Sequence, residues 1–167
     1  MFRILALTLL TFTAHAALSD AKVQLKNAKG QTLGSATLTA MKKGVRLIVE
    51  AEKLPPGELA IHFHENGKCE GPKFESAGSH FAGAAKSHGF DSDGGPHAGD
   101  MPNLIVPATG KVRAELINTA VTMGKESNSL FKAGGTSLVI HAKADDYKSQ
   151  PSGNAGDRLL CGVILPL

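Results

Sequence analysis

The segment "IHFHENGKC", residues 61–69, places His62 and His64 two residues apart in an otherwise apolar run and follows them with Cys69. In a β-strand, residues i and i+2 point to the same face, so the two imidazole rings can converge on one point. Histidines on a half-exposed strand are also common as ordinary surface residues. The pair alone therefore leaves two interpretations open, a metal site and an amphipathic strand.

Short runs with strand-like patterning surround this segment, and turn signals such as Lys29-Gly30 and Thr109-Gly110 separate them. The strands expected from this pattern are residues 21–27, 31–40, 44–51, 57–65, 103–106, 111–118, 136–142 and 157–165. We find no apolar pattern with a period of 3.6 residues over a helical length. The sequence therefore predicts an all-β fold, an antiparallel sandwich or barrel without a second domain.

A long irregular segment, residues 66–102, interrupts the strands and contains eight glycines but no sustained hydrophobic period. Compact domains rarely contain such a segment unless something holds it in place. Four histidines lie within it or at its edge, namely His64, His80, His88 and His97. Each one alone could be a solvated loop residue, but together they favour a metal that ties the loop to the barrel, because ligation then supplies folding energy. A second, shorter irregular segment covers residues 143–157.

The first 16 residues, "MFRILALTLLTFTAHA", predict a secretory signal peptide. Arg3 precedes a short apolar run, and residues 14–16, "AHA", match the small-residue pattern of a cleavage site. The apolar run is too short to span a bilayer. We therefore expect a mature domain of residues 17–167, exported to the periplasm or the extracellular space, with no integral membrane segment.

Composition argues against nucleic acid as a partner, and the number of cysteines indicates a disulfide. The net charge is +3, basic residues are scattered, and tryptophan is absent, so the chain lacks both a phosphate-binding stripe and a base-stacking platform. Nucleic acid is therefore not an expected partner. Cys69 and Cys161 enter an oxidising compartment, where an even number of cysteines usually means a disulfide. Their spacing contains no C-x-x-C motif, which argues against a zinc-thiolate site.

Six separated motifs resemble the signatures of the bacterial copper/zinc superoxide dismutase family, in the order "AIHFHE", "SAGSHF", "HGF", "GPHAGDMPNL", "VIHAKADD" and "GNAGDRLLCGVI". The resemblance covers nearly all of the chain after the signal segment. It implies a Greek-key β-barrel or sandwich of about eight strands with a long metal-binding loop, because members of this family have the β-sandwich architecture. It also implies an antioxidant oxidoreductase that dismutates superoxide to O₂ and H₂O₂, with copper alternating between Cu(II) and Cu(I).

The resemblance assigns a role to every histidine of the expected mature chain. The implied copper ligands are His62, His64, His80 and His141, and the implied zinc ligands are His80, His88, His97 and Asp100. His80 would bridge one copper and one zinc, since imidazole has two ring nitrogens, and would leave copper during turnover, carry a proton and then bridge again. Three histidines and one carboxylate leave no open position, which makes the zinc structural.

Two further residues receive roles from the resemblance. Asp145 would link His62 to His88, because a metal-bound histidine normally donates its other N–H to such a group. Judged without the resemblance, Asp145 is better explained as a turn residue beside Asp146. Arg158 would attract superoxide at the entrance of the site, although an ordinary charge at the start of a strand explains it about as well.

The resemblance also implies that Cys69 and Cys161 form an intrachain disulfide between the loop and the final strand. The chain-entropy model assigns roughly 4 to 5 kcal/mol of stabilisation to a closed loop of this length. Such a crosslink would limit how far the metal loop can drift.

Three other functions are alternatives to this enzyme. A catalytically silent copper-binding or copper-buffering protein could use the same fold, because fold does not determine function. A copper chaperone is disfavoured, since no N-terminal metal-transfer motif precedes the barrel. A purely structural sandwich would have little use for six histidines. Superoxide is thus the expected substrate, and the sequence leaves a monomer and a homodimer both open.

Overall fold

The computed structural model describes residues 20–85 and 87–165. The predicted signal segment, residues 1–16, lies outside them, as do residues 17–19 and 166–167 of the expected domain. The strands are β1 Asp20–Lys26, β2 Thr32–Ala40, β3 Val45–Ala51, β4 Gly57–Leu59, β5 Ile61–His64, β6 Leu104–Val106, β7 Val112–Asn118, β8 Thr136–His141 and β9 Arg158–Ile164, and the short 3₁₀ helix is Glu75–Ala77. The predicted all-β fold is therefore confirmed. Within the described residues, no helix is long and apolar enough to cross a membrane.

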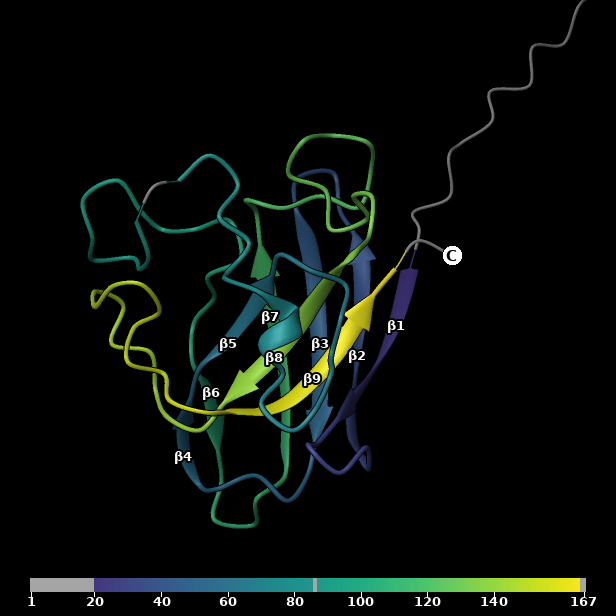
Figure 1. The fold of residues 1–167 in the computed structure, drawn as a ribbon, viewed down its shortest axis with the longest axis vertical. Coiled ribbons are helices and arrows are strands. Elements are labelled where there is room, and N and C mark those ends of the chain that lie inside the picture. The colour runs from purple at the N-terminus through teal and green to yellow at the C-terminus, as the bar shows by residue number, and fades with distance from the viewer. Residues whose placement is uncertain (1–19, 86, 166–167) are drawn as a thin grey trace, which may run out of the picture.

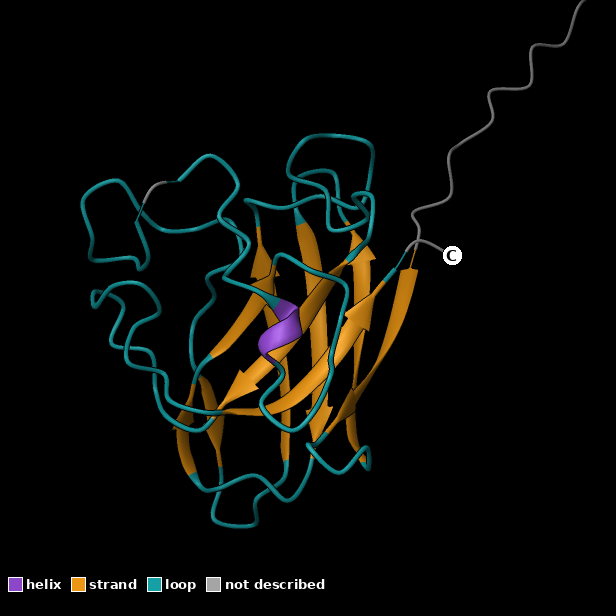
Figure 2. Ribbon diagram, in the orientation of Figure 1, coloured by secondary structure: helices purple, strands orange, loops and turns teal. Residues whose placement is uncertain are grey.

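The strands form a curled antiparallel sheet in the order β5-β8-β9-β1-β2-β3-β7, and β4 pairs with β6 in a small second sheet (Figure 1). Because β6 also lies beside β7, and β4 leads into β5, the small sheet connects the two ends of the large one. The connections that enter β4 and leave β7 cross over the strands, as a Greek-key barrel requires. Figure 2 shows that long loops lie on the outside of this barrel, beside β5 and β8.

One expected strand, residues 57–65, is divided into β4 and β5 at Ala60. The N–H of Ala60 donates to the carbonyl of Lys143 at 2.8 Å, and its carbonyl accepts from the N–H of His141 at 2.9 Å. The chain thus changes partner at this residue, from β6 on one side of it to β8 on the other. The prediction of a continuous strand was wrong here because these partners are remote in sequence.

Alternating burial places the core inside the barrel. In β1, the side chains of Ala21, Val23 and Leu25 are buried while their neighbours are exposed. In β5 and β8, every residue is buried, so both faces of these strands are covered. The inner face of β5 contributes Ile61 and Phe63 to the core. Its outer face is covered by the irregular segments, and the functional site forms there.

The irregular segment of residues 66–102 returns along the free edge of β5. The N–H of Phe81 donates to the carbonyl of Phe63 at 2.8 Å, and the N–H of Phe63 donates to the carbonyl of Gly99 at 2.9 Å. A Cβ atom at Gly99 would collide with the Phe63 carbonyl, so this close approach requires glycine. Backbone hydrogen bonds therefore hold the loop against β5, in addition to any contribution from a metal.

The expected disulfide between Cys69 and Cys161 is confirmed. It joins residues separated by 92 positions and attaches the start of the irregular segment to β9. Val139 of β8 and Phe74 pack against it in a small apolar cluster separate from the main core. The segment that precedes His80 is thereby fastened to the barrel.

Candidate metal centre

Two strands bring three histidines together on the outer face of the barrel. His62 and His64 are neighbours on the same face of β5, and His141 ends β8, which pairs with β5. All three are buried. The Nε2 atoms of His64 and His141 lie 3.4 Å apart.

The returning loop adds a fourth histidine. His80 forms an isolated antiparallel bridge with His64, and its ring centroid lies 3.9 Å from that of His62. One ring nitrogen from each of four buried residues lies within 4.8 Å of the others, namely His62, His64, His80 and His141. The structure therefore brings together all four histidines expected to bind copper.

A second cluster shares His80 with the first. One ligand atom from each of four residues again lies within 4.8 Å of the others, namely His80, His88, His97 and Asp100. The Nδ1 atoms of His80 and His88 lie 2.9 Å and 3.0 Å from the Asp100 carboxylate, and that of His97 lies 3.6 Å away. Asp100 also accepts backbone N–H groups from Gly89 and His97 at 2.9 Å each. Three ring nitrogens and a carboxylate thus converge, the donor set that was expected to bind zinc.

The hydrogen-bond acceptors around the first cluster determine which ring nitrogens carry protons. A carbonyl or carboxylate oxygen can only accept, so the ring nitrogen beside it must be the N–H. His62 Nε2 donates to Asp145 at 2.8 Å, His64 Nδ1 donates to Gly78 at 3.0 Å, and His141 Nδ1 donates to Gly156 at 3.3 Å. The remaining nitrogens, Nδ1 of His62 and Nε2 of His64 and His141, therefore present lone pairs to the cluster.

Unsatisfied buried nitrogens show that the residues fit two metal ions. Among residues 20–85 and 87–165, four buried ring nitrogens have no hydrogen-bond partner, namely His62 Nδ1, His80 Nε2, His88 Nδ1 and His97 Nδ1. His88 Nδ1 lies within ion-pair distance of Asp100 but lacks hydrogen-bond geometry. A buried polar atom without a partner is costly, and metal coordination removes that cost. Four imidazoles suit copper, while three imidazoles with one carboxylate suit zinc.

The carboxylate of Asp145 connects the two clusters. Its Oδ2 atom accepts from His62 Nε2 at 2.8 Å and its Oδ1 atom accepts from His88 Nε2 at 2.9 Å. Asn103 fixes the backbone of Asp145, accepting its N–H at 2.9 Å and donating to its carbonyl at 3.0 Å. Burial opposes ionisation of Asp145, but the hydrogen bonds from His62 and His88 outweigh burial and hold the pKa of this carboxyl well below its usual range. Asp145 therefore lies between His62 and His88, the position that the resemblance implies for it.

Three histidines of the first cluster, His62, His64 and His141, favour the neutral form. Burial, together with neighbouring histidines, lowers the pKa of His62 to about 4 and that of His141 to about 3, and it lowers the pKa of His64 well below its usual value. Burial also opposes protonation of His88, but the adjacent carboxylates of Asp100 and Asp145 outweigh burial and raise the pKa of His88 to about 9. Neutral imidazole is the form that binds metal, so His62, His64 and His141 need little deprotonation at neutral pH.

Arg158 lies at the edge of the first cluster and is half-buried. Its Nη1 atom donates to the carbonyl of Phe74 at 2.6 Å and its Nη2 atom donates to the carbonyl of Gly78 at 2.7 Å. Its positive charge is close enough to lower the pKa of both His64 and His141. The structure therefore places a held cation beside the histidines, as the role expected for Arg158 requires.

Sequence reasoning missed three residues that organise the site. The carbonyl of Gly78 accepts a hydrogen bond from His64. Asn103 hydrogen-bonds to the backbone of Asp145, and Gln150 hydrogen-bonds to the backbone of His88. Asn103 belongs to the motif "GPHAGDMPNL" and could have been found there. Gln150 lies in an irregular segment with no pattern to mark it.

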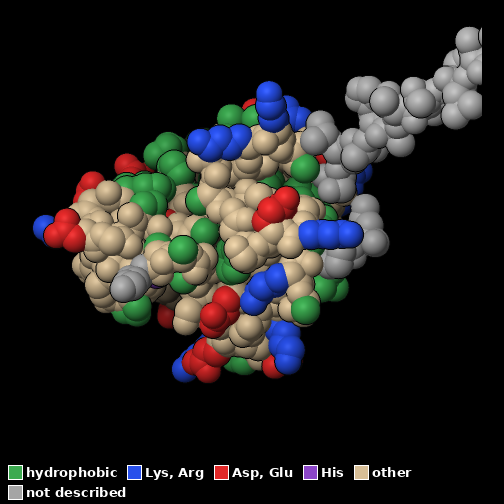
Figure 3. Space-filling model, turned by 90° about the horizontal axis from the view of Figure 1, so that it is seen from above, with side chains coloured by type: hydrophobic (Ala, Val, Ile, Leu, Met, Phe, Trp, Pro, Cys, Tyr) green, Lys and Arg blue, Asp and Glu red, His purple; other side chains and the backbone are tan. Residues whose placement is uncertain are grey.

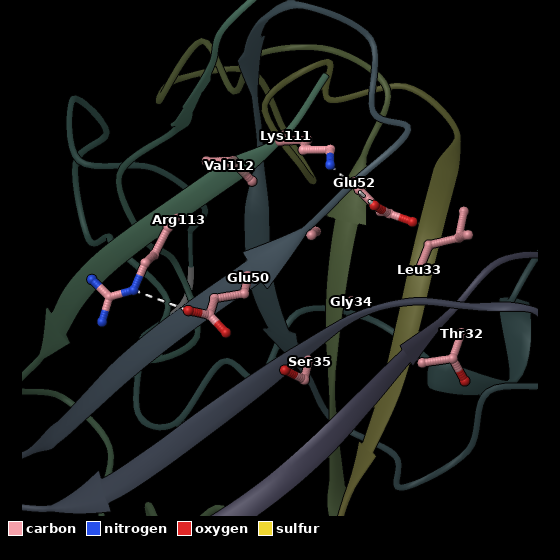
Figure 4. Close-up of a pocket in the computed structure, with 10 residues that line it drawn as sticks. Thr32, Leu33, Gly34, Ser35, Glu50, Glu52, Lys111, Val112 and Arg113 are labelled. Atoms are coloured by element: carbon pink, nitrogen blue, oxygen red, sulfur yellow. Dashed lines mark hydrogen bonds and ion pairs between the residues drawn. The ribbon is translucent and has the colours of Figure 1, made fainter. Parts of the chain in front are cut away.

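On the face shown in Figure 3, basic and acidic side chains are interspersed and almost no histidine is visible, as expected for buried clusters. An open hollow of about 700 Å³ lies over β2, β3 and β7. Two ion pairs cross its lining, Arg113 with Glu50 at 3.0 Å and Lys111 with Glu52 at 3.8 Å (Figure 4). The hollow contains none of the expected site residues, and we assign it no function.

A Greek-key barrel with two histidine clusters that share one residue defines a metalloprotein with two adjacent metal positions. The family model of copper/zinc superoxide dismutase matches residues 32–164, and the chain belongs to this family. It is 51% identical over 146 residues to one Cu-Zn superoxide dismutase of Aquifex aeolicus, covering 86% of this chain and 85% of the relative. A second one from that organism is 52% identical over 140 residues, covering 83% of each chain.

Solved structures agree with this assignment. The crystal structure of a mutant superoxide dismutase-like protein from Bacillus subtilis matches with a TM-score of 0.84 and 39% identity, covering 87% of this chain and 97% of that one. The chain is accordingly an enzyme that dismutates superoxide to O₂ and H₂O₂, and its cofactors are copper and zinc. The comparisons give no support to a catalytically silent copper-binding protein.

Proposed function

We propose that the first cluster, His62, His64, His80 and His141, binds copper, that the second, His80, His88, His97 and Asp100, binds zinc, and that His80 bridges the two ions. The observation that carries this proposal is that His80 belongs to both clusters, with Nδ1 at 2.9 Å from Asp100 and a buried, unpartnered Nε2 on the other side of the ring. The bound copper supplies one-electron chemistry between Cu(II) and Cu(I).

The chain's own residues orient the donor atoms for this chemistry. Asp145 holds the Nε2–H of His62, and the carbonyl of Gly78 holds the Nδ1–H of His64, so both rings keep their lone pairs directed into the cluster. Because Asp100 lies beside Nδ1 of His80, its Nε2 is the atom available to hold a proton and release it. His80 is therefore the proton carrier in this proposal.

Arg158 guides the substrate in this proposal. Superoxide is a small anion, and a fixed cation raises its local concentration. Two carbonyls hold the guanidinium, which leaves other N–H donors of the same group for an incoming anion. Arg158 also lines an open hollow together with Lys73 and Glu75, through which superoxide would approach.

Metal analysis and a superoxide assay on the same preparation test this assignment. We expect one copper and one zinc per chain, with activity that requires copper. Two zinc ions with no affinity for copper would overturn the proposal. Retention of both metals after replacement of His80 by alanine would also overturn the bridge.

We further propose that residues 1–16 are a cleaved signal and that the domain of residues 17–167 works in the periplasm or outside the cell. The disulfide between Cys69 and Cys161 supports export, because such bonds persist in oxidising compartments. Intact-mass measurement of protein recovered from the periplasm and the medium would test it. A mass that includes residues 1–16 would contradict cleavage.

We also propose that the domain forms a homodimer through the outer face of β6 and β7. Ile105 of β6 is 66% exposed and Ile117 of β7 is 55% exposed, and the two strands lie side by side. They are two of the five large apolar side chains exposed among the described residues, and burial against a second copy would remove them from water. Sedimentation of the wild type and of the Ile105→Lys variant tests this, with a shift from dimer to monomer expected. A monomeric wild type at all concentrations would contradict it.

A further inference from the structure

The two irregular segments meet at the backbone of His88. Gln150, in the segment of residues 143–157, accepts the N–H of His88 through Oε1 at 2.9 Å and donates to the carbonyl of His88 through Nε2 at 2.9 Å. No other partner for these two backbone groups is found among residues 20–85 and 87–165. One side-chain amide therefore satisfies both polar groups of this residue.

The pairing with Gln150 matters because the backbone groups of His88 are buried. His88 is fully buried, and buried backbone N–H and carbonyl groups need partners because they have lost water. The Nε2 atom of Gln150 also lies 3.2 Å from Ser92 Oγ and 3.0 Å from the carbonyl of Lys148, and both are acceptors that orient the amide. The reciprocal bonds to His88 are possible only with this orientation of the amide oxygen and nitrogen.

The ring of His88 is held independently of its backbone. Asp145 accepts from Nε2 at 2.9 Å, and Asp100 lies 3.0 Å from Nδ1, the nitrogen that faces the second cluster. A ring nitrogen points reliably at a metal only if both the ring torsion and the main chain that carries it are fixed. Asp145 fixes the torsion and Gln150 fixes the main chain.

We propose that Gln150 is a positioning residue for zinc, which acts through the backbone of His88; this inference rests on the zinc site of the proposed function. We call the two hydrogen bonds between Gln150 and the His88 backbone the clamp. The clamp holds the loop of His88 in its binding conformation before zinc arrives, so zinc binding costs less ordering entropy. Zinc release through opening of this loop requires both clamp bonds to break. Loss of the clamp should therefore accelerate zinc dissociation more than it weakens the barrel.

Two variants separate the clamp from the general order of its segment. Gln150→Ala removes both bonds to His88. Asn154→Gly is the matched control, because the amide of Asn154 donates to Asp146 and Ser149, all within the same segment. Glycine suits its backbone, which has a φ of 54°. The control therefore loosens the segment without touching the link to His88.

The first measurement is the rate at which a chelator removes zinc from full-length mature protein loaded with one equivalent of zinc and no copper. Removing an outer partner of a metal ligand typically costs 10- to 100-fold in affinity, so we expect zinc to leave Gln150→Ala at least about tenfold faster than the wild type. Asn154→Gly should release zinc within about threefold of the wild-type rate. Equal rates for Gln150→Ala and Asn154→Gly would overturn the inference.

The second measurement is hydrogen exchange at the amide of His88 in the same zinc-loaded protein. This N–H should exchange faster in Gln150→Ala than in the wild type and in Asn154→Gly, both of which keep the Gln150 oxygen that accepts it. Equal exchange at this amide in Gln150→Ala and the wild type would overturn the clamp as the cause. A wild type that binds no zinc, or whose zinc is unaffected by His97→Ala, would overturn the proposed zinc site instead, so the two failures are distinguishable.

Discussion

Arg158 and His64 meet at one atom, the carbonyl oxygen of Gly78. It accepts from Arg158 Nη2 at 2.7 Å and from His64 Nδ1 at 3.0 Å. The same carbonyl therefore fixes the cation that we propose attracts the substrate and the tautomer of a proposed copper ligand. Gly78 lies between the disulfide at Cys69 and His80, so the loop that carries His80 also positions Arg158.

Replacing Arg158 should slow the enzyme without emptying the site. Arg158→Ala is expected to lower kcat/KM by about ten- to hundredfold with both metals bound, and Arg158→Glu should lower it further, because the local field sets the arrival rate of an anion. Added salt should slow the wild type and should slow Arg158→Glu less, since screening weakens both attraction and repulsion. Stopped-flow assays over a salt series check this. Unchanged rates and salt dependence in both variants would reduce Arg158 to a surface charge.

Two histidine variants should separate the metals. His64→Ala is expected to abolish activity while zinc stays bound, because His64 belongs only to the first cluster. His97→Ala should lose zinc first and keep copper with residual activity, because His97 belongs only to the second cluster. Metal content and activity of purified variants measure both outcomes. Equal loss of both metals in each variant would show that the ligands are divided wrongly.

Asp145→Ala should keep the fold and weaken zinc binding by roughly 10- to 100-fold, as is typical for loss of a group that orients a metal ligand. His62 also donates to Asp145, so the electron paramagnetic resonance spectrum of bound Cu(II) should change in the same variant. Competition with a chelator and the spectrum are the two measurements. Unchanged zinc affinity would return Asp145 to the role of a turn residue.

Gly153→Ala should disturb the metal centre through contact rather than through backbone strain alone. A Cβ atom at Gly153 would collide with Asp145 Oδ1 and His88 Nε2. Gly134→Ala is the matched control, because Gly134 has a similar positive φ, 82° against 65°, and no described residue places an atom within 4 Å of the added Cβ. Both variants should lower Tm through strain, but only Gly153→Ala should release zinc faster. The same zinc release rate in the two variants would argue against the contact.

Replacing both Cys69 and Cys161 by serine should lower the free energy of unfolding by roughly 2 to 5 kcal/mol, the usual effect of losing a native disulfide. The loop beyond Cys69 carries Phe74 and Gly78, whose carbonyls hold Arg158, so kcat/KM should fall as well. Urea unfolding and activity assays measure the two effects. The wild type under reducing conditions should behave like the variant, and a stable, fully active variant would contradict this prediction.

Much of the fold was predictable because strand patterning is local. Alternating burial, as in Val23 and Leu25 of β1, follows from the period of two residues in any strand. The same rule placed His62 and His64 on one face. The division of the strand at Ala60 was not predictable, because it depends on the backbone groups of His141 and Lys143, about 80 residues further along the chain.

The sequence by itself determined the donor inventory of this protein: seven histidines, six of them beyond residue 16, one acidic residue in the motif of Asp100, two cysteines and the strands that carry some of them. Only the tertiary structure decided which nitrogen of each ring faces the metal, because that depends on oxygen acceptors such as Gly78 and Asp145 from other segments. It also decided that Gln150 reaches the backbone of His88 across 62 positions. A side chain's chemical type is a property of the sequence, but the partner it meets is set by how remote segments pack.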